Sequence, residues 1–488
     1  MQYIVGENRY QMTLMTMCLD DYIGSDSIVR VIDTFVKALD LITLGFKNAK
    51  LNECGRPPYS PATMLKLYIY GYINRVRSSR LLQAEAGRNV EVMWLTGKVV
   101  PDDRAIAYFR HDNAAALKGV FREFSIWCKE AGLYGEKSVA VDGTKIRANA
   151  NRNSIHTAKL TETKLAEVDK KIDQYLKILD EADAAQADEP TLSPITIASI
   201  LKHLKEKKEK LLDWKKQIEE NDGKEVTTVD KDAHIMHTNG DGRSLDACYN
   251  VQTVADTKNK LIIDFEVTTC PDDKGALPKM TQSAKEILEV ETIEVSADKG
   301  YYDGGDVVEC EQNSVTTYIP KAAEPSKLAN PDYRPDKFKY SPGSDTYKCP
   351  NGQILSFHRE KKRPDSEVWD RVYLNQEACK NCLDRDSCFT NIKGYRQIFR
   401  STNQDALDRN NDRMKTEAGR EKYRQRSSTI EHPFGTTKAI WGFRQYLCRG
   451  QLVTTAEQSL TFLAYNLRRV ANIFTKNGKN LVKAIRLT

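Results

Sequence analysis

Among all features of the sequence, two short apolar runs constrain the fold most. Each contains an aspartate, after which the apolar strand pattern is interrupted. Residues 138–147 (SVAVDGTKIR) alternate as a β-strand does, with Asp142 in the middle. Residues 292–300 (TIEVSADKG) form a second apolar run, which ends at Asp298. Acids placed in this way on neighbouring strands point at a common site from a rigid platform. The two runs therefore predict a sheet that brings Asp142 and Asp298 together.

Other segments indicate what surrounds these strands. Residues 248–269 read as two more strands joined by the turn-like DTKNK, and residues 315–320 as a short one. A helix is expected over residues 277–290, between two strands. Strands that alternate in this way with a helix predict an α/β sheet with mixed strand directions.

The pattern divides the chain into four predicted parts. Residues 1–135 are read as a helical, DNA-binding domain and residues 136–320 as the first part of the α/β core. A coiled-coil hairpin is expected to interrupt that core at about 156–222, because its apolar residues recur every three or four positions. Residues 321–400 read as a loop-rich, cysteine-rich insertion, and residues 401–488 as the C-terminal helical part of the core.

The helices of the first part carry several arginines, which leaves two interpretations open. They form either a helix-turn-helix-like DNA reader or a plain helical bundle, and periodicity alone does not separate the two. The arginines concerned are Arg75, Arg77, Arg80, Arg88 and Arg110.

Charge is distributed unevenly along the 488 residues. The formal net charge is only +6, yet the residues from 396 onward carry +11. This asymmetry favours a polyanionic partner near the C-terminal part, although a solvated basic helix surface would give the same count. The chain shows no long apolar run and no secretory leader, so we expect a cytoplasmic protein without a membrane contact.

The predicted pair of aspartates needs a positive partner. Carboxylates held a few ångströms apart repel one another unless a hard divalent cation neutralises them. Two Mg²⁺ ions about 3.5–4 Å apart would activate a water or a 3′-hydroxyl and stabilise the leaving oxygen of a phosphodiester. Glu431, in the arginine-rich segment 423–449, is the expected third ligand, with basic neighbours such as Arg444 on the flanking phosphates.

Four of the eleven cysteines are clustered. A C-x₂-C pair joined to two further cysteines suits tetrahedral Zn²⁺ coordination and predicts a structural zinc site. The alternative is four reduced thiols without a metal. The cysteines concerned are Cys349, Cys379, Cys382 and Cys388.

Taken together in this order, these motifs resemble those of bacterial insertion-sequence transposases of the DDE class. The resemblance rests on VDGTKIRANAN around Asp142, CYNVQTVAD, VTTCPDD, SADKGYYDG around Asp298, and the residues Tyr423, Arg426, Glu431 and Lys438. The N-terminal segments GRPPYSPATMLKLYIYGYINRVRSSRLL and PDDRAIAYFR resemble the helical domain that precedes this core in one branch of the family.

The resemblance implies a ribonuclease-H-like catalytic core in which Asp142, Asp298 and Glu431 bind two Mg²⁺ ions, with Mn²⁺ as a substitute. It implies that Tyr423, Arg426 and Lys438 contact the DNA of the transposon ends. Trp441 is a candidate for stacking on an unpaired base, although packing in the core is the preferred interpretation. The expected partners are the inverted repeats, target DNA on the nucleoid, and at least one further copy of the chain.

Three functions follow, and all of them predict DNA binding. The first is a transposase that cleaves DNA at the ends of its insertion sequence and joins the freed 3′-OH to target DNA. The second is a ribonuclease-H-like endonuclease without strand transfer. The third is a non-catalytic DNA-binding derivative, which the presence of all three acids disfavours.

Overall fold

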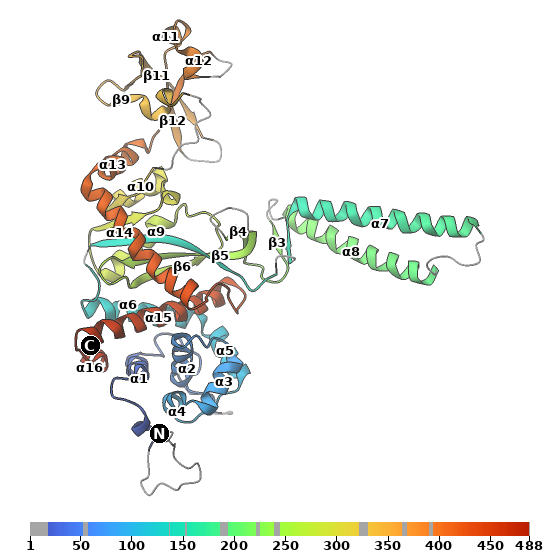
Figure 1. Cartoon of the computed structure of the whole chain (residues 1–488), viewed down its shortest axis with the longest axis vertical. Helices are drawn as coiled ribbons and strands as arrows, with labels where there is room; N and C mark the ends of the chain where they lie inside the picture. The colour runs from blue at the N-terminus through green and yellow to red at the C-terminus, as the bar shows by residue number, and fades with distance from the viewer. Residues whose placement is uncertain are drawn as a thin grey trace, which may run out of the picture.

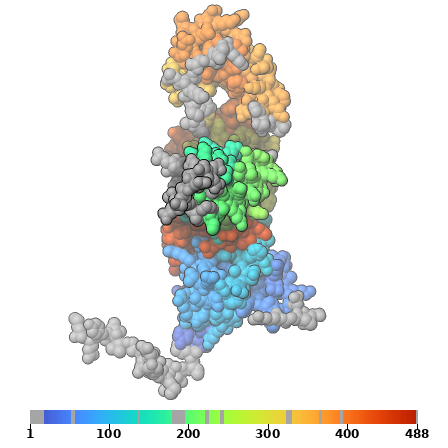
Figure 2. All heavy atoms as spheres, turned by 90° about the vertical axis from the view of Figure 1, so that its right-hand side faces the viewer, coloured from blue at the N-terminus to red at the C-terminus, as the bar shows by residue number. Residues whose placement is uncertain are grey.

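The computed structural model describes residues 18–51, 57–135, 137–151, 154–185, 194–220, 225–238, 245–321, 330–363, 368–389 and 394–487. The molecule is elongated, with a central sheet between a group of N-terminal helices and a small sheet at the opposite end (Figure 1). A long helical hairpin projects sideways from the central sheet. In Figure 2 this hairpin points at the viewer, and the small sheet and the N-terminal helices mark the two ends.

The N-terminal part is helical. Its elements are η1 (Leu19–Tyr22), α1 (Ile28–Ala38), α2 (Pro61–Ile73), α3 (Ser79–Arg88), α4 (Val90–Thr96), α5 (Asp103–Asp112) and α6 (Ala114–Glu130). Proline at the first position of α2 and the Asp102 cap of α5, which accepts a hydrogen bond from the Ala105 amide, set where these helices begin. Helix α2 is buried almost all round, so it forms the centre of this part.

Within the described residues the central sheet has six strands, and their directions are mixed, as the sequence predicts. They are β1 (Ser138–Arg147), β4 (His234–His237), β5 (Leu245–Asp256), β6 (Ile262–Thr268), β7 (Ile293–Ala297) and β8 (Val315–Tyr318). The order is β4-β5-β1-β7-β8, and β6 also pairs with β5. Strand β1 runs antiparallel to β5 and parallel to β7, which is in turn parallel to β8. The order is compatible with a ribonuclease-H-like core, which stays a proposal.

The C-terminal part is helical too. It comprises α13 (Gln404–Lys415), α14 (Glu417–Phe434), the π-helical turn η6 (Gly435–Ile440), α15 (Gln451–Lys476) and α16 (Leu481–Leu487). Three earlier helices connect strands of the central sheet: α9 (Ala276–Leu288), η3 (Lys299–Tyr301) and α10 (Gly304–Gln312). Helix α14 crosses one face of the sheet, and α15 lies between the sheet and the N-terminal helices (Figure 1).

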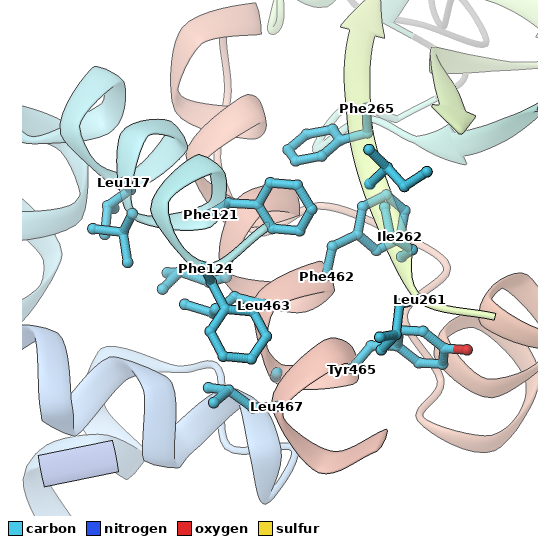
Figure 3. Close-up of a cluster of buried hydrophobic side chains, with 14 of the residues drawn as sticks. Leu117, Phe121, Phe124, Leu261, Ile262, Phe265, Phe462, Leu463, Tyr465 and Leu467 are labelled. Carbon is cyan, nitrogen blue, oxygen red and sulfur yellow. The ribbon is translucent and has the colours of Figure 1, made fainter. Parts of the chain in front are cut away.

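Aromatic packing holds α15 against both neighbours. Phe265 on β6 meets Phe121 of α6 edge-on at 5.1 Å and Phe462 of α15 at the same ring distance (Figure 3). Leu463 and Leu467 extend the same cluster along α15. Edge-to-face pairs of this kind add about 0.5–1.5 kcal/mol each to the burial of their surface. The N-terminal helices and the sheet thus share one continuous core.

The hairpin consists of α7 (Ala158–Ala185) and α8 (Pro194–Glu220), which leave the sheet through the short paired strands β2 (Ile155–His156) and β3 (Val226–Thr227). Val168, Leu204 and Leu211 are buried between the two helices. Lys208 forms an ion pair of 2.7 Å with Asp169 across them. The heptad-like spacing in the sequence explains this packing.

In the described part of the segment predicted to be loop-rich, the structure instead contains a five-stranded antiparallel sheet. Its strands are β9 (Lys339–Ser341), β10 (Thr346–Lys348), β11 (Ile354–Lys362), β12 (Trp369–Leu374) and β13 (Gln397–Ser401), in the order β13-β12-β11-β10-β9. The turns η4 (Pro331–Tyr333) and η5 (Pro335–Lys337) precede it, and the short helices α11 (Gln376–Lys380) and α12 (Arg385–Cys388) lie between β12 and β13. The loop prediction was wrong because these strands are short and largely polar.

Two of the arginines proposed as DNA readers bind groups of the protein itself. Arg110 is 8% exposed and donates a hydrogen bond to the Tyr72 hydroxyl at 3.2 Å. Arg77 pairs with the fully buried Glu457 at 3.3 Å. These contacts favour the bundle interpretation at both positions. No helix in the described part of the chain is long and apolar enough to cross a membrane.

Candidate active site

The central sheet brings Asp142 and Asp298 to the same level on adjacent strands. The parallel pairing of β1 with β7 places Val141 opposite Ala297, so the next residue on each strand is an aspartate. Asp142 continues in β1, whereas Asp298 ends β7 and caps η3 by accepting a hydrogen bond from the Gly300 amide. Two carboxylates from residues 156 positions apart therefore face one point because of strand register.

Burial and charge make this pair electrostatically unusual. Burial raises the pKa of Asp142 to about 6, Arg426 opposes that shift, and the nearby charge of Asp298 adds to it. Arg426 Nη1 lies 3.0 Å from Asp142 Oδ2. The pKa of the Arg426 guanidinium is raised despite its burial, with Asp142 as the leading favourable charge. Arg426 thus offsets only part of the cost of holding the two acids together, because the pKa of Asp142 stays raised.

A third carboxylate, which sequence reasoning missed, lies beside Asp298. Asp273 Oδ1, in the connection between β6 and α9, accepts hydrogen bonds from Asn250 Nδ2 at 2.9 Å and Gln252 Nε2 at 2.7 Å. Gln252 accepts in turn from the buried Tyr301 hydroxyl. The motifs CYNVQTVAD and VTTCPDD contain these residues, but no local pattern indicates that they meet. The network ties the chain that follows Asp298 to β5.

Two glycines allow this close approach. A Cβ atom at Gly300 would stand 2.9 Å from Asp298 Oδ1 and 3.3 Å from Asp273 Oδ2, so both carboxylates border one position. A Cβ atom at Gly143 would stand 2.7 Å from Asp273 Oδ1 and 2.8 Å from Gln252 Nε2. The break that the sequence suggested after Asp142 is absent, because β1 continues through Gly143, and the glycine is a packing requirement instead.

Gly143→Ala is expected to lower stability by about 1–3 kcal/mol, because the added methyl group overpacks the buried amide–carboxylate network. We expect DNA cleavage to fall as well, since the network positions Asp298. Chemical denaturation measures the first effect and a cleavage assay the second. The matched control is Gly87→Ala, where a Cβ meets nothing within 4 Å in helix α3; it should be neutral or slightly stabilising.

Glu431 does not join the two aspartates in this structure. Its side chain is exposed, and the neighbouring Ile430 faces the sheet, where it packs with Ala140 and Ala255. Glu431 lies five positions after Arg426, which turns it about 140° away around α14. Among the described residues, no group of three Cys, His, Asp or Glu side chains is close enough to hold a metal ion.

Lys438 contacts the sheet as well. Its ammonium donates hydrogen bonds of 2.9 Å to Thr144 Oγ1 and to the Lys145 carbonyl, and burial lowers its pKa. In a regular α-helix, Lys438 would lie close to the face of Glu431, seven residues earlier. That geometry is not observed, because η6 is a π-helical turn that changes the phase of the helix between the two residues.

The remaining predicted DNA contacts lie around the same helix. The Tyr423 ring lies 5.6 Å from the Arg426 guanidinium. Arg444 is exposed and donates a hydrogen bond to the Lys438 carbonyl at 3.2 Å. Trp441 is half-buried and packs against the main core, which favours its packing interpretation.

The four clustered cysteines line one pocket of the small sheet, together with Tyr333 and Phe389. The Gln353 amide donates a hydrogen bond to Cys349 Sγ at 3.3 Å, and Asn351 Nδ2 donates to Cys382 Sγ at 3.6 Å. Burial raises the pKa of Cys388 to about 11, Arg396 opposes this, and the other three thiols add to it. Thiols 39 residues apart in sequence thus lie within electrostatic reach of one another.

Comparison with known protein families gives two matches. Residues 348–471 match the family model described as a transposase DDE domain. Residues 17–112 match a second one, described as a transposase domain (DUF772). The first match contains Glu431 and the four cysteines, whereas neither contains Asp142 or Asp298. No curated protein and no solved structure is significantly similar to the chain.

Proposed function

We propose, on the premise that this chain is an insertion-sequence transposase of the DDE class, that it binds the inverted repeats of its element, cleaves DNA at those ends and joins the 3′-OH to target DNA. The observation that carries the proposal is the placement of Asp142 and Asp298 at one level of two parallel strands. Arg426, paired with Asp142, adds a cationic group that can bind a phosphate.

The aspartate pair fits a divalent cation. The two carboxylates lie close together, and burial raises the pKa of Asp142 while the charge of Asp298 adds to that shift. Their oxygen atoms match the ligand preference of Mg²⁺, with Mn²⁺ as a substitute. Two bound ions would activate the attacking oxygen and stabilise the leaving one. Asp142 and Asp298 are the residues that would hold them, while the hydrogen bonds of Asp273 and Gln252 keep the Asp298 turn in position.

We propose that Glu431 becomes the third ligand only in the DNA complex. It does not reach the aspartates in the observed structure, so α14 must turn or shift for it to do so. The helix contains Pro433 and continues into the π-helical turn η6 just beyond Glu431. Such irregular turns are frequent at functional sites and provide a place where a helix changes its phase.

Two variants decide whether Glu431 or Asp273, which already lies beside Asp298, is the third metal ligand. If Glu431 is the ligand, Glu431→Gln abolishes cleavage and Asp273→Asn lowers it more modestly by loosening the Asp298 turn. Cleavage that persists in Glu431→Gln but disappears in Asp273→Asn would assign the third position to Asp273. Binding of a labelled transposon end should survive in both variants.

The function as a whole is tested by strand joining. Purified protein, Mg²⁺ and labelled terminal inverted repeats should give nicked ends and then joined products with a target duplex. Cleavage without a joined product would favour an endonuclease without strand transfer. Binding without cleavage would favour a non-catalytic derivative. Because joining requires two ends together, we also expect at least two copies of the chain on DNA.

We further propose a structural Zn²⁺ held by Cys349, Cys379, Cys382 and Cys388. Support comes from their common pocket and from the amide hydrogen bond to Cys349 Sγ, although the thiols must draw closer to reach coordination distances. The turn after Cys349 bends back at Gly352, whose φ of 82° favours glycine.

The purified protein is expected to contain about one zinc per chain by plasma mass spectrometry, because four thiolates complete a tetrahedral site. Cys379→Ser should lose the metal and destabilise the small sheet. The exposed Cys270 offers a control, and Cys270→Ser should retain full zinc content. The proposal would be contradicted if the wild-type protein contained no zinc and the two variants were equally stable.

A further inference from the structure

One face of the small sheet carries exposed basic side chains around the buried Val372 and Leu374. The core side of the sheet carries the buried Tyr347, Leu355 and Tyr373. Because side chains alternate along a strand, their neighbours lie on the opposite side, here called the open face. The open face carries Lys339, Lys348, Arg359, Lys361 and Phe399, all of them exposed.

Strand register places these residues on one surface. Lys348 pairs with Lys339 on β9 and with Ile354 on β11, so the three lie in one row across the strands. Arg359 pairs with Val372, which pairs in turn with Phe399. The irregularity in β11 between Phe357 and Arg359 shifts the alternation by one residue, and Arg359 and Lys361 therefore fall on the open face.

The positive charges of the open face are not neutralised by protein. Lys339, Lys348, Arg359 and Lys361 form no ion pair or side-chain hydrogen bond within the described residues. Asp370, in the same row as Lys361, accepts hydrogen bonds from Nε and Nη2 of Arg363 at 2.8–3.0 Å. Arg363 thus neutralises Asp370, and the four cations of the open face remain free to bind an anionic partner.

We propose that the open face binds the phosphate backbone of duplex DNA beside the element's ends, which rests on the proposed transposase function. About 20 Å separates the row of Lys348 from Lys361 along β11. A duplex carries roughly twelve phosphate charges over that length. Four unpaired cations with Phe399 and Ile354, 49% and 54% exposed, form a surface that contacts a backbone without reading its sequence.

The salt dependence of binding tests this surface. A full-length variant is compared with wild type on a long duplex that contains one transposon end. The variant carries four substitutions together: Lys339→Gln, Lys348→Gln, Arg359→Gln and Lys361→Gln. Loss of four phosphate contacts should reduce the slope of log K against log[salt] by about 3–4 and weaken binding at least tenfold at 0.1 M salt. The protected length in a hydroxyl-radical footprint should also shorten.

The control carries the same charge change elsewhere. Lys202, Lys205, Lys207 and Lys210 are exposed on α8, and their four glutamine substitutions should leave slope and footprint unchanged. If the open-face variant and the wild type show equal salt slopes while the wild-type protein cleaves the end, this inference alone is overturned. Wild-type protein that neither binds nor cleaves the end would overturn the proposed function as well. The substituted residues are exposed, and a melting curve should confirm an intact fold.

Discussion

Asp298→Asn is expected to lower DNA cleavage at least about 10³-fold, or about 4 kcal/mol of transition-state stabilisation, while end binding stays close to wild type. The amide is isosteric and its oxygen can still accept the hydrogen bond from the Gly300 amide, so the turn after β7 should persist. What the variant loses is a negative charge opposite Asp142, and with it half of the cation-binding pair.

Cleavage of a labelled end and its binding by gel shift, measured on the same preparation, separate chemistry from recognition. Asp272→Asn is the matched control, because Asp272 is exposed and precedes the buried network without entering it. It should cleave normally. Either lost end binding or unimpaired cutting in Asp298→Asn would contradict the assignment of Asp298.

Glu457→Ala should reduce the free energy of unfolding by about 3–5 kcal/mol, the largest stability effect we expect from a single side chain. The Glu457 side chain is fully buried on α15. It accepts hydrogen bonds from the Leu447 and Cys448 amides at 2.9 and 3.1 Å, and pairs with Arg77 at 3.3 Å. Alanine would leave a cation and two amide donors without their acceptor.

The expected effect extends beyond α15, because Arg77 belongs to the N-terminal helices. Its guanidinium also donates to the Gln445 carbonyl and lies 4.7 Å from the Phe443 ring. Urea denaturation measures the shift, with Asp412→Ala as the control. Asp412 pairs with Lys415 in full solvent contact, where an ion pair is worth about 1 kcal/mol or less. Comparable shifts in the two variants would contradict a stabilising role for Glu457.

Strong local patterns predicted much of the fold. Alternation around Asp142 and the apolar run before Asp298 indicated buried strands, and the three- and four-residue spacing in 158–220 indicated paired helices. The small sheet escaped prediction because β9 and β10 have three residues each and β11 is almost wholly exposed. A strand with a single buried residue shows too little alternation to recognise.

The candidate site was predicted only in part, for related reasons. Asp142 and Asp298 follow strand signals, whereas Asp273 meets Asn250 and Gln252 through a contact between separate elements. The direction of Glu431 depends on the phase of α14, and that of Lys438 on a π-helical turn. The pairing of Arg426 with Asp142 joins residues 284 positions apart.

The sequence by itself determined the identities of the acids, the basic character of the C-terminal part and the elements with strong periodicity, because these depend on neighbouring residues. Tertiary structure alone decided that Asp142 and Asp298 share a level, that Arg77 and Arg110 point inward, and that four cations of the small sheet share a face. Register between strands and the rotation of a helix about its axis arise from long-range packing, which no local pattern records.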